Sequence, residues 1–291
     1  MAARTIGLIG VGLVGSALAE RWQRTGWSVV GYDIDPEFRS RLEPCGATVA
    51  CNIKEVIAAA EMVVLSLPNS TISAGVIDDC APGLQGKTII DTTTGEPGEM
   101  AAMGQRLSEM GIRYLDATIA GSSAQIRAGE VLVMVGGDTE AVTDCAAVFA
   151  AFASQTMHVG PWGAGAEMKL VVNLVLGLNR AVLAEGLSFA RRLGIDPQRA
   201  LEVLQSSPAF SRVMDTKGRK MITGDFSPQA RLAQHHKDVR LILAAGARAG
   251  ARLPLSQLHA ALLTEREAAG DGDLDNSAII RAFESERSES P

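Results

Sequence analysis

The sequence predicts an α/β fold, an N-terminal Rossmann-type doubly wound parallel sheet followed by an all-α C-terminal domain. Short apolar runs alternate with helical patterns through the first half of the chain, as in βαβ units. A glycine-rich segment directly follows the first apolar run. No strand pattern follows residue 157. We therefore expect a Rossmann domain over residues 1–162 and an all-helical domain over residues 163–291.

The expected strands are the short apolar runs, and the run that ends before Pro68 is apolar at every position but Ser66. Strands covered by helices on both faces have such continuous apolar sequences. The expected strands span residues 5–10, 27–32, 47–50, 62–67, 88–91, 114–117 and 131–135. Helices are expected between them, the first ending at Gly26. The others span residues 36–42, 53–60 and 100–110.

The second half begins with a long helical pattern over residues 165–192, which meets no turn signal until Gly194. Shorter helices are expected over residues 196–204, 212–221, 232–250, 254–270 and 276–284, separated by Pro, Gly and Asp. The long apolar helix exceeds what one small helical domain can cover. We therefore expect a homodimer or homotetramer, and the sequence does not choose between them.

Composition excludes several classes of protein. The chain has 291 residues, 47% of them hydrophobic, which excludes wholesale disorder. Its net charge of −6 argues against nucleic acid or an acidic membrane surface as partner. No uninterrupted run of 18 apolar residues occurs, so no membrane span is expected. The four cysteines form no CxxC pair, so we expect reduced thiols and no metal site. The N-terminal residues show no signal-peptide pattern, so we expect a cytoplasmic location.

The glycine-rich segment matches G-x-G-x-x-G at Gly10, Gly12 and Gly15, between a strand and a helix. In such a segment the first glycine permits the tight turn, the second lets the backbone approach a pyrophosphate, and the third lets helix pack on strand. The amides of Leu13 and Val14, at the helix N-terminus, would face the phosphate charge. The alternative is a glycine-rich turn with no ligand.

Asp33 closes the second expected strand, where a carboxylate accepts hydrogen bonds from the adenosine ribose of a dinucleotide. A 2′-phosphate there would meet Asp33 and Asp35, with no Lys or Arg in the next few positions. We therefore expect NAD, and NADP less. The alternatives are that Asp33 is only a turn residue before Pro36, and that Arg39 folds back toward a phosphate.

Over almost its whole length the chain resembles the β-hydroxyacid dehydrogenase family, the group of 3-hydroxyisobutyrate dehydrogenase and tartronate semialdehyde reductase. Besides the glycine turn, the segments that carry the resemblance are Leu67-Pro68-Asn69, Asp91-Thr92-Thr93-Thr94, the G-x-G-x-x-x-K-x-x-x-N pattern over residues 163–173, and Lys237-Asp238. The resemblance implies that Leu67, Pro68 and Thr94 contact the cofactor. It also implies that Lys237 lies beside cofactor and substrate.

Lys169 and Asn173 are four residues apart and share one face of the long helix. Their neighbours are apolar on nearly every side, which predicts a buried helix and a lysine with a depressed pKa. The resemblance implies hydride transfer between a nicotinamide and a small hydroxyacid or semialdehyde. Lys169 would be the general acid or base, and Asn173 would hold the substrate oxygen or orient Lys169. The alternative is a structural salt bridge with Glu167 or Glu185.

The expected substrate loop, residues 116–129, departs from the family pattern D-A-P-V-S-G-G. Ala120 replaces the family serine and Ser122 replaces its second glycine. We expect Gly121, Ser122 and Ser123 to bind the anionic end of the substrate from shifted positions. That anion is a carboxylate or another group, such as a sulfonate, and the role of Gln125 stays open.

The same residues argue against three alternative functions. A 6-phosphogluconate dehydrogenase would have a histidine where Val172 stands and a much larger helical domain, and an imine reductase would replace Lys169. Non-catalytic scaffold relatives of this fold lose the lysine and carry extra domains. The four histidines show no metal-ligand spacing, and the roles of His235 and His236 stay open.

Overall fold

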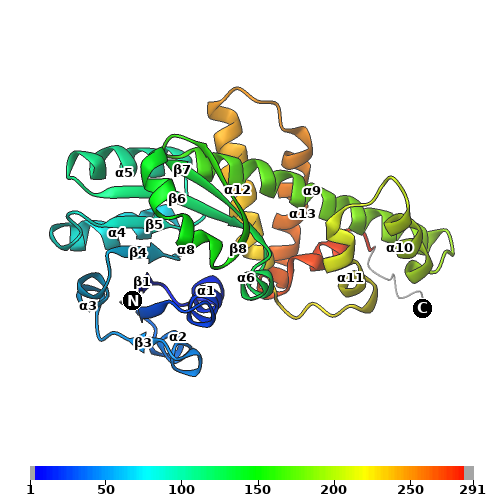
Figure 1. The fold of residues 1–291 in the computed structure, drawn as a ribbon. Helices are drawn as coiled ribbons and strands as arrows, with labels where there is room; N and C mark the ends of the chain where they lie inside the picture. Colours follow the sequence, from blue (N-terminus) through cyan, green and yellow to red (C-terminus); the bar gives the residue numbers. More distant parts are fainter. Residues whose placement is uncertain (1–3, 285–291) are drawn as a thin grey trace. The chain divides into compact units, whose positions relative to one another are not determined.

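A computed structural model describes residues 4–284 (Figure 1). The chain divides into two compact units, Met1–Lys169 and Leu170–Pro291. The division falls inside helix α9 (Ala164–Arg192), whose first turns belong to unit 1 and whose remainder belongs to unit 2. The domain boundary expected after residue 162 lies just before this helix.

Unit 1 is built on one eight-stranded sheet in the order β3-β2-β1-β4-β5-β6-β7-β8. All neighbouring pairs are parallel except β6–β7. The strands are β1 (Thr5–Ile9), β2 (Ser28–Tyr32), β3 (Thr48–Val49), β4 (Met62–Leu65), β5 (Thr88–Asp91), β6 (Arg113–Ala120), β7 (Val131–Gly137) and β8 (Ala153–Gly160). Strand order reverses direction between β1 and β4, the point at which open α/β sheets bind ligands. The predicted Rossmann-type fold class is confirmed.

Strand β8 was not expected from the sequence. Its residues are mostly exposed and polar, because it lies at the edge of the sheet and pairs only with β7. Such a strand lacks the apolar run that identified the inner strands.

Helices cover both faces of this sheet (Figure 1). One apolar core lies beneath α1 (Leu13–Arg24), α6 (Ser123–Ala128), α7 (Thr139–Asp144) and α8 (Ala146–Ala150). The other lies beneath α3 (Ile53–Ala59), α4 (Ser70–Cys80) and α5 (Pro97–Glu109). Helix α2 (Pro36–Arg39) is shorter than expected, and 3₁₀ turns span Glu43–Cys45 and Ala81–Gly83. The sequence did not predict α4, α6, α7 or α8, which are short or carry many small polar residues.

Unit 2 is helical, as predicted, and its described residues contain no strand beyond an isolated bridge between Arg231 and Asp275. Its helices are the rest of α9, α10 (Pro197–Ser206), α11 (Arg219–Thr223), α12 (Leu232–Arg248) and α13 (Pro254–Ala268). A π turn, Met214–Gly218, interrupts the helix expected over residues 212–221. The segments Asp271–Asp273 and Asn276–Ala282 are 3₁₀ helices.

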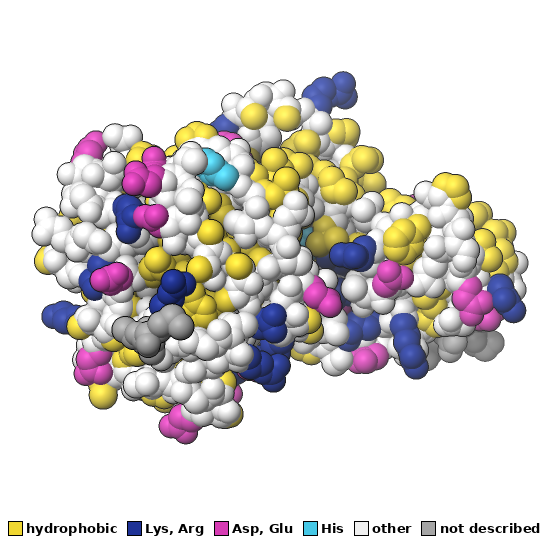
Figure 2. Space-filling model, in the orientation of Figure 1, with side chains coloured by type: hydrophobic (Ala, Val, Ile, Leu, Met, Phe, Trp, Pro, Cys, Tyr) yellow, Lys and Arg dark blue, Asp and Glu magenta, His cyan; other side chains and the backbone are white. Residues whose placement is uncertain are grey.

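Helix α9 is not buried all round, contrary to the expectation from its sequence. Val171, Val175, Val182 and Phe189 are more than half exposed, and Figure 2 shows apolar side chains on the surface of the helical unit. Among the described helices α9 alone is long and apolar enough to cross a membrane, yet 44% of its most apolar window is buried. Its buried side chains, among them Leu183, Ala184 and Leu187, belong to the apolar core of unit 2.

Candidate functional site

The glycine turn after β1 shows which of its glycines the fold itself requires. Gly10 has φ +94°, and a Cβ there would lie 2.3 Å from the Ser66 carbonyl oxygen. A Cβ on Gly15 would lie 2.0 Å from the Gly10 carbonyl oxygen. A Cβ on Gly12 would meet no atom within 4 Å. The protein therefore leaves the space above Gly12 open, which is where a ligand can approach the backbone closely.

The N-terminus of α1 carries backbone amides that no side chain caps. Gly12 is the N-cap, and the first turn holds no acidic residue. The amides of Leu13, Val14 and Gly15 are therefore available to an anion, and the helix dipole favours negative charge there. These residues fit the pyrophosphate of a dinucleotide.

Asp33 lies at the end of β2 and braces the glycine turn. Its Oδ2 accepts from the Val11 amide at 2.7 Å, and its Oδ1 accepts from the Asp35 amide at 2.9 Å. Each oxygen retains a lone pair with which a ribose hydroxyl can bond. The next side chain, Ile34, is 88% exposed and apolar. Arg39 lies over the Tyr32 ring, with its Cζ 5.5 Å from the ring centroid.

Hydrogen bonds join the segments that follow β4 and β5. The Thr92 hydroxyl donates to the Leu65 carbonyl oxygen at 2.7 Å, and the Thr93 hydroxyl accepts from the Leu67 amide at 3.1 Å. Pro68 and Thr94 are the next residues of these two segments, which end at the carboxyl edge of the sheet. This is the edge at which the glycine turn lies.

Asp116 fastens the start of α9 to strand β6, a role that sequence reasoning missed. Its two carboxylate oxygens accept from the amides of Gly163 and Ala166, each at 2.9 Å. The side chain is fully buried, and this desolvation raises the pKa of Asp116 to about 6. The Thr118 hydroxyl adds a bond to the Gly165 carbonyl oxygen at 2.8 Å. An acidic residue inside an apolar strand was the signal available in the sequence.

These hydrogen bonds from Asp116 and Thr118 place Lys169 beside the end of β6. The Lys169 Nζ donates to the Ile119 carbonyl oxygen at 2.7 Å, next to Ala120, the last residue of β6. The side chain is half-buried, not fully buried as its apolar neighbours suggested. It lies in the first turns of α9, where the helix has one side on the sheet and another exposed.

The expected substrate loop folds into the short helix α6. Ser122 caps this helix in a capping box: its amide and hydroxyl bond the Gln125 Oε1 at 2.9 and 3.1 Å. Gln125 therefore shapes the loop, a role that the S-x-x-Q pattern could have revealed. Ser123 is the first residue of the helix. Gly121 is required because a Cβ there would lie 2.5 Å from Val131.

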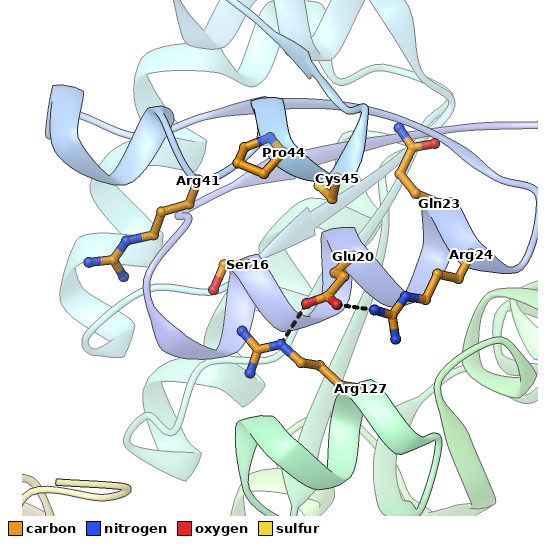
Figure 3. A pocket seen from close by; sticks show the side chains of 8 residues that line it. All are labelled: Ser16, Glu20, Gln23, Arg24, Arg41, Pro44, Cys45 and Arg127. Atoms are coloured by element: carbon orange, nitrogen blue, oxygen red, sulfur yellow. Dashed lines mark hydrogen bonds and ion pairs between the residues drawn. The ribbon is translucent and has the colours of Figure 1, made fainter. Parts of the chain in front are cut away.

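Ion pairs join α6 to α1. The Arg127 Nε contacts the Glu20 Oε2 at 2.6 Å, and Arg24 contacts the other oxygen of Glu20 at 2.6 Å (Figure 3). These side chains line a hollow of about 620 Å³, together with Ser16, Gln23, Arg41, Pro44 and Cys45. No predicted site residue lines it. The pairs connect the expected substrate loop to the helix that begins at the glycine turn.

In unit 2, Asn173, Lys237 and Asp238 come together. The Asn173 Nδ2 donates to the Asp238 Oδ2 at 3.0 Å, and the Lys237 Nζ lies 3.4 Å from the Asp238 Oδ1. Because the amide nitrogen bonds to Asp238, the Asn173 Oδ1 is oriented as an acceptor on the other side. The sequence indicated Asn173 and Lys237 but not that Asp238 joins them.

The histidines of unit 2 pack between helices. The His236 Nδ1 lies 2.5 Å from the Glu267 Oε2, and the His235 ring lies 5.2 Å from the His259 ring. Burial lowers the pKa of His259 to about 4, with Arg180 and His236 adding to the effect. The described residues contain no group of three or more His, Cys, Asp or Glu that could hold a metal ion.

Comparison with known proteins supplies the family. A model for the NAD-binding domain of 6-phosphogluconate dehydrogenase matches residues 5–160. A model described as NAD-binding of NADP-dependent 3-hydroxyisobutyrate dehydrogenase matches residues 163–283. The L-threonate dehydrogenase of Cupriavidus necator is 30% identical, over 96% of each chain. The 2-(hydroxymethyl)glutarate dehydrogenase of Eubacterium barkeri is 31% identical, over 96% of this chain and 94% of its own. A structure of Mycobacterium tuberculosis 3-hydroxyisobutyrate dehydrogenase with L-serine superposes with TM-score 0.88 at 26% identity, over 97% of this chain and 100% of its own.

Proposed function

Because the chain belongs to the β-hydroxyacid dehydrogenase family, we propose that it transfers hydride between NAD(H) and a small β-hydroxyacid or its semialdehyde. The observation that carries the proposal is the position of Lys169, whose ammonium is held at the Ile119 carbonyl beside the substrate loop. Asn173 follows one turn later on the same helix. A proton donor and an oxygen acceptor on one helix face suit the interconversion of an alcohol and a carbonyl.

The cofactor would be held by Gly10, Gly12 and Gly15 with the amides of Leu13 and Val14, since these residues leave room and bare amides for a pyrophosphate. When bound, the nicotinamide supplies or accepts the hydride. The proposed contacts from the neighbouring strands and from unit 2 are Leu67, Pro68, Thr94 and Lys237. Asp33 favours NAD over NADP, because its carboxylate and that of Asp35 repel a 2′-phosphate.

In the reduction, Lys169 would protonate the developing alkoxide, and in the oxidation it would accept the hydroxyl proton. The Ile119 carbonyl fixes the Nζ through a 2.7 Å hydrogen bond. The Asn173 Oδ1 would accept a hydrogen bond from the substrate hydroxyl, since its Nδ2 already bonds Asp238. Each group thus holds its atom in position before the reaction starts.

We propose that Gly121, Ser122 and Ser123 receive the anionic end of the substrate, together with Lys237. The capping box uses the hydroxyl of Ser122 for Gln125, which leaves Ser123 as the stronger candidate of the two serines. The relatives named for L-threonate and 2-(hydroxymethyl)glutarate support a hydroxycarboxylate. A sulfonated aldehyde is the alternative, because the loop departs from the family pattern.

We also propose that the enzyme is cytoplasmic and self-associates through α9. Met168, Val171, Val175, Val182 and Phe189 are exposed at helical spacing, so they form one apolar stripe. A second copy of the chain would remove this stripe from water.

The decisive experiment is Lys169→Met, which keeps the apolar stem and removes the proton. General acid–base catalysis contributes ~10²–10⁴-fold, so kcat for a semialdehyde with NADH should fall by about that factor. The Kd for NADH should stay unchanged. Lys54→Met, which removes an exposed lysine of the same unit, is the control and should leave kcat intact. Retention of more than about a tenth of kcat would exclude Lys169 as the proton donor.

Gly12→Ala tests the cofactor site without straining the fold. The new Cβ meets no protein atom, so the stability should hold while the Kd for NADH rises at least tenfold. Gly75→Ala is the matched control, since its Cβ also meets nothing but lies away from the turn. Titration by NADH fluorescence measures the Kd for NADH of both variants. Equal Kd values would exclude Gly12 as a contact of the pyrophosphate. The unmodified protein should bind NADH more tightly than NADPH.

A further inference from the structure

The hollow beside α1 gathers positive charge, although the chain as a whole has a net charge of −6. Its volume of about 620 Å³ lies within the range of small-molecule sites. Arg24, Arg41 and Arg127 line it, and Glu20 is the one acidic residue of its lining (Figure 3). All the lining residues belong to unit 1. The hollow is therefore formed by one compact unit and favours a negatively charged ligand.

Glu20 offsets only part of this positive charge. Its Oε2 lies 2.6 Å from the Arg127 Nε, and its Oε1 lies 2.6 Å from Arg24, so one carboxylate serves two guanidinium groups. Arg127 uses its Nε for this pair, and its Nη groups have no hydrogen-bond partner among residues 4–284. In Figure 3 these Nη groups point away from Glu20, to the side on which Ser16 and Arg41 lie. Arg127 thus retains donors that face the hollow.

Arg41 supplies a third cation from the chain that follows α2. Its Cζ lies 4.2 Å from the centroid of the Phe38 ring, and stacking of this kind orients the plane of a guanidinium group. Its ion pair with Glu37 is long, at 3.9 Å, and the Glu37 side chain is 81% exposed. Exposed pairs of this kind contribute little. Arg41 is therefore oriented by the ring and remains available to a second anion.

The remaining lining groups indicate what kind of ligand the hollow suits. Ser16 adds a hydroxyl, and Gln23 is held in place because its Nε2 donates to the Gly46 carbonyl oxygen at 2.8 Å. The apolar part of the lining is confined to Pro44 and Cys45, and none of the lining residues is aromatic. A ring system such as a nucleobase would find no aromatic partner here. A compact ligand rich in negatively charged oxygens would find several donors.

We propose that this hollow is an anion site, separate from the glycine turn, that binds a compact polyanion with two or more phosphate or carboxylate groups. Guanidinium groups bind both kinds of oxyanion through paired N–H donors. Arg24 lies on α1, Arg41 follows α2 and Arg127 lies on α6, so one ligand with several charged groups can bond all three segments. Such a ligand would hold α6 against α1. The proposal does not depend on the function proposed above.

The first test uses Cys45, which lines the hollow, as a reporter of its occupancy. Its reaction with iodoacetamide, a neutral reagent, is followed by tandem mass spectrometry with pyrophosphate or citrate at constant ionic strength. Cys51 is exposed and does not line the hollow, so it is the internal control. Either probe should slow the reaction of Cys45 and leave that of Cys51 unchanged, and the tighter one shows which oxyanion is preferred. No protection by either probe at up to about 10 mM would overturn the proposal.

The second test uses variants with effects of opposite sign on the Kd obtained from this protection. Arg41→Gln and Arg127→Gln should each raise the Kd about tenfold or more, because each removes charged hydrogen-bond donors. Glu20→Gln removes the competing carboxylate and should lower the Kd several-fold. Arg113→Gln, which removes a member of an exposed pair with Asp144 in the same unit, should leave it unchanged. An unchanged Kd in both hollow-lining arginine variants, with folding verified by circular dichroism, would overturn the proposal, as would a raised Kd in Glu20→Gln.

Discussion

The two units bury carboxylates in opposite ways. In unit 1, Asp91 and Asp116 are fully buried and accept hydrogen bonds from neutral groups. Asp91 accepts from the Thr93 amide and the Tyr114 hydroxyl. Asp116 accepts from two backbone amides at the start of α9. Desolvation raises the pKa of both. In unit 2, Asp275 is equally buried and also accepts from backbone amides, but it bonds the Lys217 ammonium as well, and its pKa falls to about 2.

The difference follows from the backbone that surrounds each group. At the carboxyl edge of a sheet, loops and helix N-termini offer amides that no strand or helix has used. In unit 2 the amides that reach Asp275 come from the segment before α12 and from the start of a 3₁₀ helix, and the Lys217 ammonium adds a positive charge beside this carboxylate. Unit 1 therefore uses its acids to hold loops and a helix end around the site. Unit 2 uses its acids in ion pairs.

The largest expected effect is the loss of the ion pair in unit 2. Lys217→Met leaves Asp275 buried without its cation, which should lower the free energy of unfolding by about 3–5 kcal/mol. Urea unfolding followed by circular dichroism measures it. Arg199→Met removes one member of an exposed pair with Glu202 in the same unit and should cost less than about 1 kcal/mol. Similar losses of unfolding free energy in the two variants would contradict the expectation that the buried ion pair contributes more than the exposed one.

The next effect is a pH dependence of opposite sign in the two units. The folded-state pKa of Asp116, about 6, exceeds its unfolded value of 3.8, so the folded form binds the proton more tightly. Unit 1 should therefore gain up to about 3 kcal/mol of stability as pH falls from 7 to 4. The folded-state pKa of Asp275, about 2, lies below 3.8. Its contribution, about 2 kcal/mol, is complete above pH 4 and is lost as pH falls toward 2.

Urea unfolding at pH 7, 5.5, 4 and 2.5 separates these two effects. Trp22, Trp27 and Trp162 all lie in unit 1, so their fluorescence reports on that unit. Asp116→Asn should remove the Asp116 share of the gain between pH 7 and 4, leaving that of Asp91, without changing the acid loss. Asp275→Asn should remove the acid loss and leave the gain. An undiminished gain in Asp116→Asn would assign the whole effect to another group.

The smallest effect concerns two glycines of α9. Gly177→Ala places a Cβ 2.5 Å from the His235 Nε2, so overpacking should cost about 1–3 kcal/mol. Gly186→Ala meets no atom within 4 Å and should gain about 0.5–1 kcal/mol, because alanine is the better helix former. The thermal unfolding temperatures of the two variants check this expectation. Equal shifts would mean that the histidine rings do not pack on the helix at Gly177.

The sequence by itself determined the features that depend on neighbours along the chain. The alternation of apolar runs and helical patterns indicated the sheet, and the spacing of Gly10, Gly12 and Gly15 indicated the turn after β1. Lys169 and Asn173 could be assigned to one helix face, because a helix brings residues four apart together. The capping box of Ser122 and Gln125 was also local, and the S-x-x-Q pattern contained it.

The tertiary structure alone decided which distant residues meet. Asn173 contacts Asp238 across 65 residues, and Asp116 reaches the start of α9 across 47. No period or spacing encodes such pairs, because they depend on how separate elements pack. The same holds for burial: the sequence of α9 is apolar on nearly every side, yet packing covers one face and exposes the other. Local sequence thus determined which groups the chain carries, and packing decided which of them are buried, charged and close together.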